Sequence, residues 1–373
     1  MSFTADDHRY MARALQLARR GLYTTQPNPR VGCVIVRDGQ IVGEGWHERA
    51  GEPHAEIHAL RMAGEAARGA DVYVTLEPCS HFGRTPPCAN ALVQAGVARV
   101  VAAMVDPNPL VAGNGLRVLQ QAGIVTASGL LESDARALNP GFISRMERNR
   151  PYIRLKMAMS LDGRTAMESG ESVWITGEAA RRDVQFLRAQ AGAILTGIGT
   201  VLADDPSLNV RLTAAELGIS GEVYQPVRVV LDSSLQFPLT AKMLDIPGTT
   251  RIYTCSTDVQ KITQLEQAGV IVRRFAGNKL QLPEVMAALV DDGITEVHVE
   301  AGATLCGVLV EQGFADELVI YLAPHLMGSS ARALFNLPHI ARMHERIALD
   351  IRDIRAVGQD WRLIAVLKQE VTH

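Results

Sequence analysis

The sequence predicts an α/β protein built from two modules in series. Helical and strand patterns alternate along most of the chain, which is typical of a sheet covered by helices on both faces. The chain has 373 residues, and at roughly 100–200 residues per domain this length predicts two or three domains. The net charge is +1 over residues 1–149 and −4 over residues 150–373, where all five lysines lie. Two modules of different composition follow from these observations.

Composition narrows the class of protein further. Hydrophobic residues make up 47% and charged residues 21%, the balance of a globular protein with a sizeable core. A net charge of −3 argues against a protein that wraps nucleic acid. No stretch approaches the ~20 apolar residues of a membrane span, and the acidic N-terminal segment does not resemble a signal peptide. Five cysteines, an odd number, fit a reducing cytoplasm better than a disulfide framework.

The first module opens with a predicted helix over residues 4–20. Thr4 and Asp7 have the spacing of a capping box, and Gly21 ends the pattern. Asp38-Gly39 predicts a hairpin between two apolar strands. The predicted strands are 31–36, 40–45, 71–76, 98–105 and 124–128, and the later helices are 54–67, 88–95 and 115–122. Their alternation predicts a three-layer domain.

The charged stretch 144–151 is the best candidate for a linker, and its alternative is the solvated end of a helix. We place the domains at 1–147 and 148–373. The second domain is another α/β module, and its last two strands are expected to form an antiparallel edge. Its predicted strands are 152–159, 193–197, 227–232, 250–255, 269–275, 296–300, 317–323, 350–357 and 361–368, and its helices are 178–190, 258–267, 283–291 and 303–311.

The sharpest motif is His54-x-Glu56, followed by Pro78-Cys79 and then Cys88. This combination is typical of zinc-dependent deaminases. One imidazole and two thiolates leave the fourth zinc position open for water, and zinc brings the pKa of that water toward neutrality. We therefore predict one zinc ion held by His54, Cys79 and Cys88. Glu56 is the predicted catalytic residue, because its carboxylate can move the water's proton to the ring nitrogen and the leaving amine.

Any single buried His or Cys is usually structural, so the zinc prediction rests on the combination. His58 lies four residues after His54, but the residues between them do not form an HExxH motif, and we expect it to pack or to face solvent. Cys33, Cys255 and Cys306 lie in apolar stretches and are expected to be small core residues.

The spacing of the two cysteines departs from the short deaminase motif, in which they are three residues apart. Here they are nine apart, and the loop between them adds His81 and Arg84. A hydrogen-bond donor and a permanent cation beside the metal suit a substrate that carries a phosphate.

These segments resemble the bifunctional deaminase/reductase family of riboflavin biosynthesis. The resemblance runs across essentially the whole chain and includes the following segments: Pro-Asn-Pro-Arg-Val-Gly at 27–32, Ala-Gly-Glu-Pro-His-Ala-Glu at 50–56, the Glu-Pro-Cys to Cys stretch at 77–88, Lys-Met-Ala-Met-Ser-Leu-Asp-Gly at 156–163 and Leu-Ala-Asp-Asp-Pro at 202–206. It implies a cytidine-deaminase-like N-terminal domain and a dihydrofolate-reductase-like C-terminal domain. In the deaminase domain it implies that the substrate is contacted by Asn28, His47, His81 and Arg84, the last replaced by lysine in some members.

Without the resemblance, the residues of the second domain give weaker evidence of function than those of the first. Gly197-Ile-Gly199 and the turn after Glu300 place glycines at the ends of two strands. Such turns can bind a pyrophosphate at a helix N-terminus, or they can simply make tight turns. The resemblance implies an NADPH site lined by Ala158, Trp174, Thr200, Asp204, Ser233, Gly302, Ala303, Thr304, Leu305, Cys306, Gly307 and Val308. It also implies that the ribosyl phosphate is held by Lys156, Ser172, Arg188, Leu208, Arg211 and Glu300.

The resemblance implies zinc-dependent deamination of 2,5-diamino-6-ribosylamino-4(3H)-pyrimidinone 5′-phosphate, followed by NADPH-dependent reduction of the ribosyl chain to ribityl. The expected partners are this small-molecule substrate and a second copy of the chain in a homodimer, without nucleic acid or membrane. Two alternatives remain at this point. One is a nucleic-acid or nucleotide deaminase with an RNA-binding appendage, which the acidic second domain disfavours. The other makes the second domain a non-catalytic sensing or dimerisation module.

Overall fold

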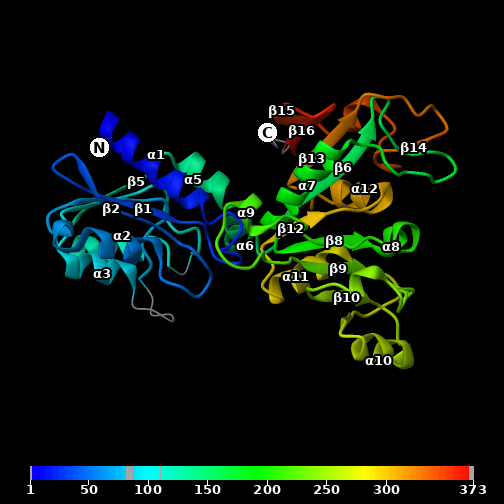
Figure 1. Cartoon of the computed structure of the whole chain (residues 1–373), viewed down its shortest axis with the longest axis horizontal. Coiled ribbons are helices and arrows are strands. Elements are labelled where there is room, and N and C mark those ends of the chain that lie inside the picture. The colour runs from blue at the N-terminus through cyan, green and yellow to red at the C-terminus, as the bar shows by residue number, and fades with distance from the viewer. Residues whose placement is uncertain (1, 81–86, 110, 369–373) are drawn as a thin grey trace. The chain divides into compact units, whose positions relative to one another are not determined.

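A computed structural model describes residues 2–80, 87–109 and 111–368. The chain forms two compact units that divide between Asn149 and Arg150 (Figure 1). The sequence-based boundary at 147/148 falls two residues earlier, in the last turn of the helix Pro140–Arg148. In the described part of the chain no helix is long and apolar enough to cross a membrane.

The sheet of the first unit has five strands in the order β2-β1-β3-β4-β5. The strands are β1 (Gly32–Arg37), β2 (Gln40–Trp46), β3 (Asp71–Val74), β4 (Arg99–Ala102) and β5 (Val125–Ser128). β1 pairs antiparallel with β2 and β3, whereas β3, β4 and β5 are parallel. Asp38 and Gly39 have φ of 51° and 76°, as a tight hairpin turn requires, so the predicted hairpin is confirmed.

Helices cover both faces of this sheet (Figure 1). The helices are α1 (Ala5–Arg19), α2 (Ala55–Ala63) with a 3-10 turn (Gly64–Ala67), α3 (Cys88–Ala95), α4 (Asn114–Gln121), α5 (Glu132–Leu138) and α6 (Pro140–Arg148). Alternate residues of β1 face opposite sides. Ile35 is buried in a cluster with residues of α2, α3 and α4, and Val34 in a cluster with residues of α1, α5 and α6. The predicted three-layer domain is confirmed.

Neither α5 nor α6 was predicted from the sequence, and the proposed linker at 144–151 lies largely within α6. Residues 144–148 form the last turn of α6, and Asn149 ends the helix with a φ of 50°. Ile143 is buried on the α1 side of the sheet, so only the outer face of the helix carries the charges that suggested a linker. The stretch is therefore a solvated helix end, the alternative that the charge pattern had left open.

The second unit is built on a nine-stranded sheet in the order β11-β10-β9-β8-β12-β6-β13-β16-β15. The strands are β6 (Tyr152–Ser160), β8 (Ala193–Gly197), β9 (Val227–Leu231), β10 (Thr250–Thr254), β11 (Ile271–Arg274), β12 (Glu296–Val299), β13 (Glu317–Ala323), β15 (Leu349–Val357) and β16 (Asp360–Leu367). All neighbours from β11 to β13 are parallel. β16 and β15 add antiparallel strands, which confirms the predicted edge. β7 (Arg164–Ala166) and β14 (Arg332–Ala333) form a separate ribbon.

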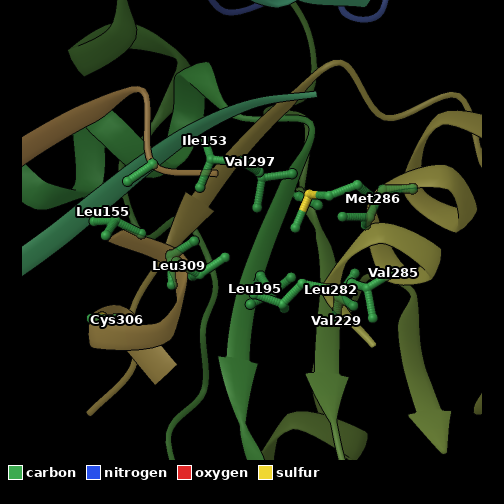
Figure 2. Packing of buried hydrophobic residues seen from close by; sticks show 14 of the residues in the cluster. Ile153, Leu155, Leu195, Val229, Leu282, Val285, Met286, Val297, Cys306 and Leu309 are labelled. Atoms are coloured by element: carbon green, nitrogen blue, oxygen red, sulfur yellow. The ribbon is translucent and has the colours of Figure 1, made fainter. Parts of the chain in front are cut away.

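The main core of this unit lies between the sheet and the helices α11 and α12. The helices are α7 (Glu178–Gln190), α8 (Ile198–Asp204), α9 (Ala214–Leu217), α10 (Val259–Gln267), α11 (Leu282–Asp291) and α12 (Ala303–Glu311), with 3-10 turns at Lys242–Leu244 and Met343–Glu345. Figure 2 shows Ile153, Val297 and Leu195 from the strands packing beside Val285 and Leu309 from the helices. Each such side chain contributes about 1.5–3 kcal/mol when fully buried.

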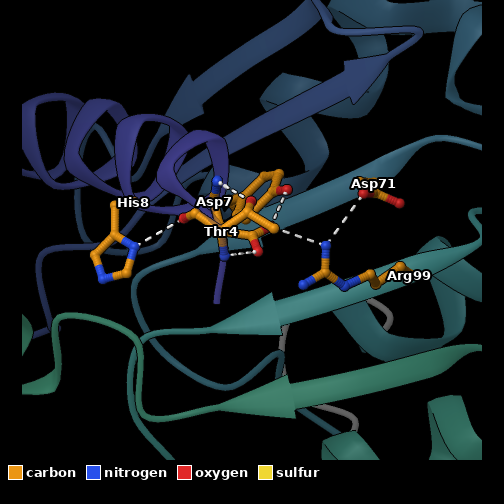
Figure 3. A network of polar contacts seen from close by, with 6 residues as sticks. Thr4, Asp7, His8, Asp71 and Arg99 are labelled. Carbon is orange, nitrogen blue, oxygen red and sulfur yellow. Dashed lines mark hydrogen bonds and ion pairs between the residues drawn. The ribbon is translucent and has the colours of Figure 1, made fainter. Parts of the chain in front are cut away.

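A buried polar network joins α1 to the sheet of the first unit (Figure 3). Thr4 and Asp7 cap α1 reciprocally, as predicted. The Asp7 carboxylate also accepts hydrogen bonds from Tyr73 Oη (2.7 Å) and Arg99 (2.9 Å). Burial alone would raise the pKa of Asp7, but Arg99, Thr4 and Tyr73 together lower it well below its usual range.

Asp7→Asn is expected to destabilise the first unit by about 1.5–3 kcal/mol at neutral pH, the usual contribution of a hydrogen bond to a charged group. Because the pKa of Asp7 is lower in the folded than in the unfolded chain, its contribution is present at neutral pH. It is lost as the pH falls below about 4 toward the folded pKa. Urea unfolding of both proteins across this range measures the difference. A stability difference that did not shrink in acid would contradict the assignment.

Candidate functional site

Three metal-ligating side chains converge in the first unit, beyond the carboxyl end of β3. His54 is the N-cap of α2, Cys88 is the first residue of α3, and Cys79 lies in the loop after β3. Their ligand atoms all lie within 4.8 Å of one another. His54 Nδ1 is 3.6 Å from Cys79 Sγ and 3.3 Å from Cys88 Sγ. An imidazole and two thiols at this spacing fit a zinc ion with one open position.

The α3 N-terminus stabilises one of the thiols as a thiolate. The backbone N–H of Cys88 donates to Cys79 Sγ at 3.3 Å. The Cys88 thiol, this amide and His54 together lower the pKa of Cys79, whereas the Cys79 thiolate and burial raise the pKa of Cys88. One thiolate is therefore already favoured, and a cation is needed to favour the second.

Glu56 lies in the first turn of α2, beside the ligands. Its side chain is 3% exposed, and its Oε2 has no hydrogen-bond partner among the residues that the structure describes. Burial, and then the nearby Cys79 thiolate, raise the pKa of Glu56 to about 7. A carboxyl with this pKa and an unpartnered buried oxygen can both accept and donate a proton near neutral pH.

Of the four predicted deaminase substrate contacts, the structure brings two together. Asn28 Nδ2 is 3.1 Å from His47 Nε2, and the His47 ring stands edge-on to the His54 ring at 5.4 Å. Burial lowers the pKa of His47. His81 and Arg84 lie outside the described residues. His47 therefore lies beside the metal-ligating residue His54, and Asn28 is joined to it by this contact.

The remaining cysteines behave as expected of core residues. Cys33, Cys255 and Cys306 are buried, and Cys33 and Cys306 lie within hydrophobic clusters. His58 is half-buried on α2.

In the second unit, most of the predicted reductase residues lie on elements that meet the carboxyl ends of the parallel strands. Parallel strands end at the same edge, where α/β sheets commonly bind ligands. The residues come from β6 (Lys156, Ala158), the segment 167–177 (Ser172, Trp174), α7 (Arg188), α8 (Thr200, Asp204), the loop after α8 (Leu208, Arg211), the end of β9 (Ser233), the end of β12 (Glu300) and the start of α12 (Gly302 to Val308).

The centre of this edge is a buried ion pair. Arg188 Nε and Nη2 donate to the two oxygens of Glu300 at 2.5 and 2.9 Å, and Nη1 donates to the Asn209 carbonyl at 2.9 Å. Although burial alone would raise it, the Arg188 guanidinium holds the pKa of Glu300 well below its usual range. The fork that sequence analysis assigned to a phosphate is directed at Glu300.

Two further cations surround this pair. Burial lowers the pKa of Lys156, while Glu300 opposes that shift. The Arg211 backbone N–H donates to Gln185 Oε1 at 3.0 Å, which fixes the loop, while the side chain is exposed. Burial and the Arg188 guanidinium lower the pKa of Arg211. Arg211 is therefore the arginine of the edge that faces solvent.

The glycine turn after Glu300 opens α12, with Gly302 as its N-cap and open space beside its Cα. The residues that follow Gly302 differ in their surroundings. Cys306 is fully buried in the core (Figure 2). A Cβ at Gly307 would lie 2.0 Å from the Asn336 carbonyl, so this glycine permits close backbone packing. A ligand at this turn would meet the first residues of α12 and not the Cys306 side chain.

Two buried residues at these sites have no role predicted from the sequence. Glu77 is 5% exposed and lies two residues before Cys79. His298 is fully buried, and its Nε2 is 3.4 Å from Glu300 Oε1. The alternation of Glu296, His298 and Glu300 with valines could have placed these three side chains on one face of a strand. For Glu77 the only signal was a carboxylate in an otherwise apolar stretch.

Comparisons with known proteins agree with this division into two sites. Residues 4–104 match the family described as the cytidine and deoxycytidylate deaminase zinc-binding region. Residues 151–363 match the RibD C-terminal domain.

The similarity to individual proteins extends along the full chain. The riboflavin biosynthesis protein RibD of Escherichia coli is 53% identical over 359 residues, covering 95% of this chain and 97% of that protein. A solved RibD structure from Acinetobacter baumannii superposes with a TM-score of 0.90 at 48% identity, covering 98% and 99% of the two chains. A Thermotoga maritima structure named as a diaminohydroxyphosphoribosylaminopyrimidine deaminase/5-amino-6-(5-phosphoribosylamino)uracil reductase superposes at 0.84, with 30% identity over 97% of this chain. The chain therefore belongs to the RibD family and is a bifunctional deaminase and reductase of riboflavin biosynthesis.

Proposed function

We propose that the first unit removes the 2-amino group of 2,5-diamino-6-ribosylamino-4(3H)-pyrimidinone 5′-phosphate by hydrolysis. The second unit then reduces the ribosyl chain of the product, giving 5-amino-6-ribitylamino-uracil 5′-phosphate. The observation that carries the proposal is the placement of the two sites. A zinc-type triad with a buried carboxyl lies in one unit, and a cationic edge around Glu300 lies in the other.

In the deaminase site, His54, Cys79 and Cys88 would hold one zinc ion per chain, which when bound supplies a Lewis acid and a water of lowered pKa. The chain's own contribution is proton transfer and orientation. Glu56 would accept one proton from the attacking water and pass it to the ring nitrogen. It would then carry the second proton, from the hydroxyl now on the substrate carbon, to the amine, which leaves as ammonia when the C–N bond breaks and the carbonyl forms. Asn28 and His47, held 3.1 Å apart, would orient the pyrimidine, and His81 and Arg84 would contact the substrate from the intervening loop.

In the reductase site, NADPH would lie along the strand ends, where it supplies a hydride. We assign its contacts to the residues named above for the cofactor, with the buried Cys306 contributing through its backbone and not its side chain. Reduction needs an electrophilic C1, which the ring-opened imine of the ribosylamine provides. Glu300, fixed by Arg188, can accept hydrogen bonds from sugar hydroxyls. Lys156 and Arg211 place positive charge where the phosphate would bind. Ser172 and the backbone of Leu208, whose side chain is buried in a hydrophobic cluster, would complete the contact.

A coupled assay tests the proposal. Given the diaminopyrimidinone phosphate, the full chain should release ammonia first and oxidise NADPH afterward. Oxidation of NADPH should not begin before ammonia appears. Ammonia release without any NADPH oxidation would show that the second unit is a non-catalytic module.

Arg211→Lys is expected to raise the reductase KM, because lysine offers a point charge in place of the guanidinium fork. Arg211→Ala should cost about 1.5–3 kcal/mol of binding, the usual value for a hydrogen bond to a charged group. Steady-state kinetics with phosphorylated and dephosphorylated substrate measures both effects. If the dephosphorylated substrate suffered equally from Arg211→Ala, the phosphate contact would be wrong. NADPH affinity and deaminase activity are the internal controls.

We also propose that the chain acts as a homodimer in the cytoplasm. β15 is an edge strand that exposes Ile351 and Ile354, each 53% exposed, and its neighbour β16 exposes Trp361. On β15 the apolar side chains are interspersed with charged ones, and exposed apolar side chains on an edge strand are often covered by a partner. A second copy would cover them. The thiols Cys79 and Cys88 must stay reduced to bind zinc, which the cytoplasm ensures. Sedimentation of the full chain measures the assembly.

A further inference from the structure

We propose that Glu77 is the positioning residue of the metal centre. Its carboxylate ties the segment that carries Cys79 to the N-terminus of α4, and so holds the Cys79 thiolate where the metal requires it. This inference rests on the zinc site proposed above and extends it to a residue outside the ligand set.

Glu77 makes four hydrogen bonds to backbone amides. Oε2 accepts from the N–H of Asp106 at 3.0 Å and of Gly113 at 2.9 Å. Oε1 accepts from the N–H of Gly115 at 2.8 Å and of Leu116 at 3.3 Å. The side chain is 5% exposed, so these bonds form away from water, where bonds to a charged acceptor are strongest.

The helix α4 depends on this carboxylate. Its N-cap is Gly113, which provides no side-chain cap, although helices usually obtain one from Ser, Thr, Asp or Asn. Glu77 supplies the cap from a different loop, and its negative charge meets the positive end of the helix dipole. The position of Glu77 and the order of the α4 N-terminus are therefore coupled, and such coupling acts in both directions.

Backbone contacts around Glu77 link its position to the positions of the metal ligands. A Cβ at Gly115 would lie 1.9 Å from the Pro78 carbonyl oxygen, so α4 packs directly on the residue before Cys79. The Cys79 carbonyl accepts from the N–H of Ala89 in α3 at 3.1 Å, and α3 begins at Cys88. The Cys79 segment thus spans α4 on one side and α3 on the other. Displacement of the α4 contact would change the separation of the two thiolates.

Glu77→Gln is the substitution that tests this coupling. The amide has nearly the same shape as the carboxylate but presents one oxygen and one NH₂, so two of the four amides would face a donor. Asp7→Asn is a matched control, since Asp7 is an equally buried carboxylate of the same unit that accepts from Tyr73 and Arg99. It lies on the opposite face of the sheet from α4.

Zinc affinity is measured by competition with a chromogenic chelator on the full chain. We expect Glu77→Gln to weaken zinc binding about tenfold or more, the range found when a residue that orients a metal ligand is removed. The zinc affinity of Asp7→Asn should stay within about twofold of that of the wild type, even if its unfolding midpoint falls as far as that of Glu77→Gln. Equal zinc affinity in the two variants would overturn the inference.

The wild-type chain provides a second test that needs no substitution. Removal of zinc should speed hydrogen exchange at the amides of Gly113, Gly115 and Leu116, and leave exchange at Thr4, whose amide donates to Asp7, unchanged. Identical exchange at the three α4 amides with and without zinc would also overturn the inference. Failure of the wild type to take up zinc would overturn the proposed function as well, whereas normal uptake with unaffected α4 amides would overturn this inference alone.

Discussion

Glu56→Gln should retain zinc and lose deaminase activity by about 10²–10⁴-fold, the usual contribution of a general acid–base residue. The amide has nearly the shape of the carboxyl but cannot accept the water's proton. Glu56 is not a predicted ligand, and its Oε2 has no hydrogen-bond partner among the described residues. The substitution should therefore leave the positions of His54, Cys79 and Cys88 unchanged.

Metal analysis measures whether zinc is retained, and ammonia release measures the loss of deaminase activity. The reductase activity of the same preparation, supplied with already deaminated substrate, is the internal control and should be unchanged. A loss smaller than about tenfold would remove Glu56 from the proton-transfer role. Loss of zinc together with activity would instead indicate that Glu56 supports the metal site.

The second large effect is expected at the ion pair of the reductase edge. Glu300→Leu leaves the Arg188 guanidinium buried without its partner, which costs about 3–5 kcal/mol for pairs of this kind. The folded pKa of Glu300 lies below its unfolded value, so the contribution of its charge is present at neutral pH and is lost only in acid. Urea unfolding of the second unit at pH 7 should show this loss of stability.

The double variant Arg188→Met, Glu300→Leu separates stability from function. Replacing a whole buried pair by apolar side chains is often neutral, so stability should recover toward that of the wild type. Reductase activity should be lost in both the single and the double variant, because both lack Glu300, the acceptor for the sugar hydroxyls. A double variant that is both stable and fully active would show that the pair has only a structural role.

Much of the fold could be predicted because its signals are local. The capping box at Thr4 and the hairpin turn at Asp38 each depend on a few neighbouring residues, and both were confirmed. The helix α6 was not predicted, because its charged outer face dominates residues 144–148 and its apolar contacts with α1 come from the tertiary structure. The convergence of His54, Cys79 and Cys88 could be predicted because the three residues belong to a recognisable motif in which His54 and Cys88 stand at helix starts.

The ion pair between Arg188 and Glu300 could not be predicted in the same way. The two residues are 112 positions apart in the sequence, and an arginine near a phosphate site and an arginine in a buried pair look alike in one dimension. The role of Glu77 was hidden for a related reason. Its partners are backbone amides, which have no signature in the side-chain sequence.

The most direct test of the central claim, that one chain houses two independent sites, is to remove zinc from the full-length protein and follow both reactions. After chelation, release of ammonia from the diaminopyrimidinone phosphate should stop and should return when zinc is added back. NADPH oxidation with already deaminated substrate should continue at the same rate throughout. Ammonia release that persisted in zinc-free protein, or NADPH oxidation that stopped with it, would contradict the account.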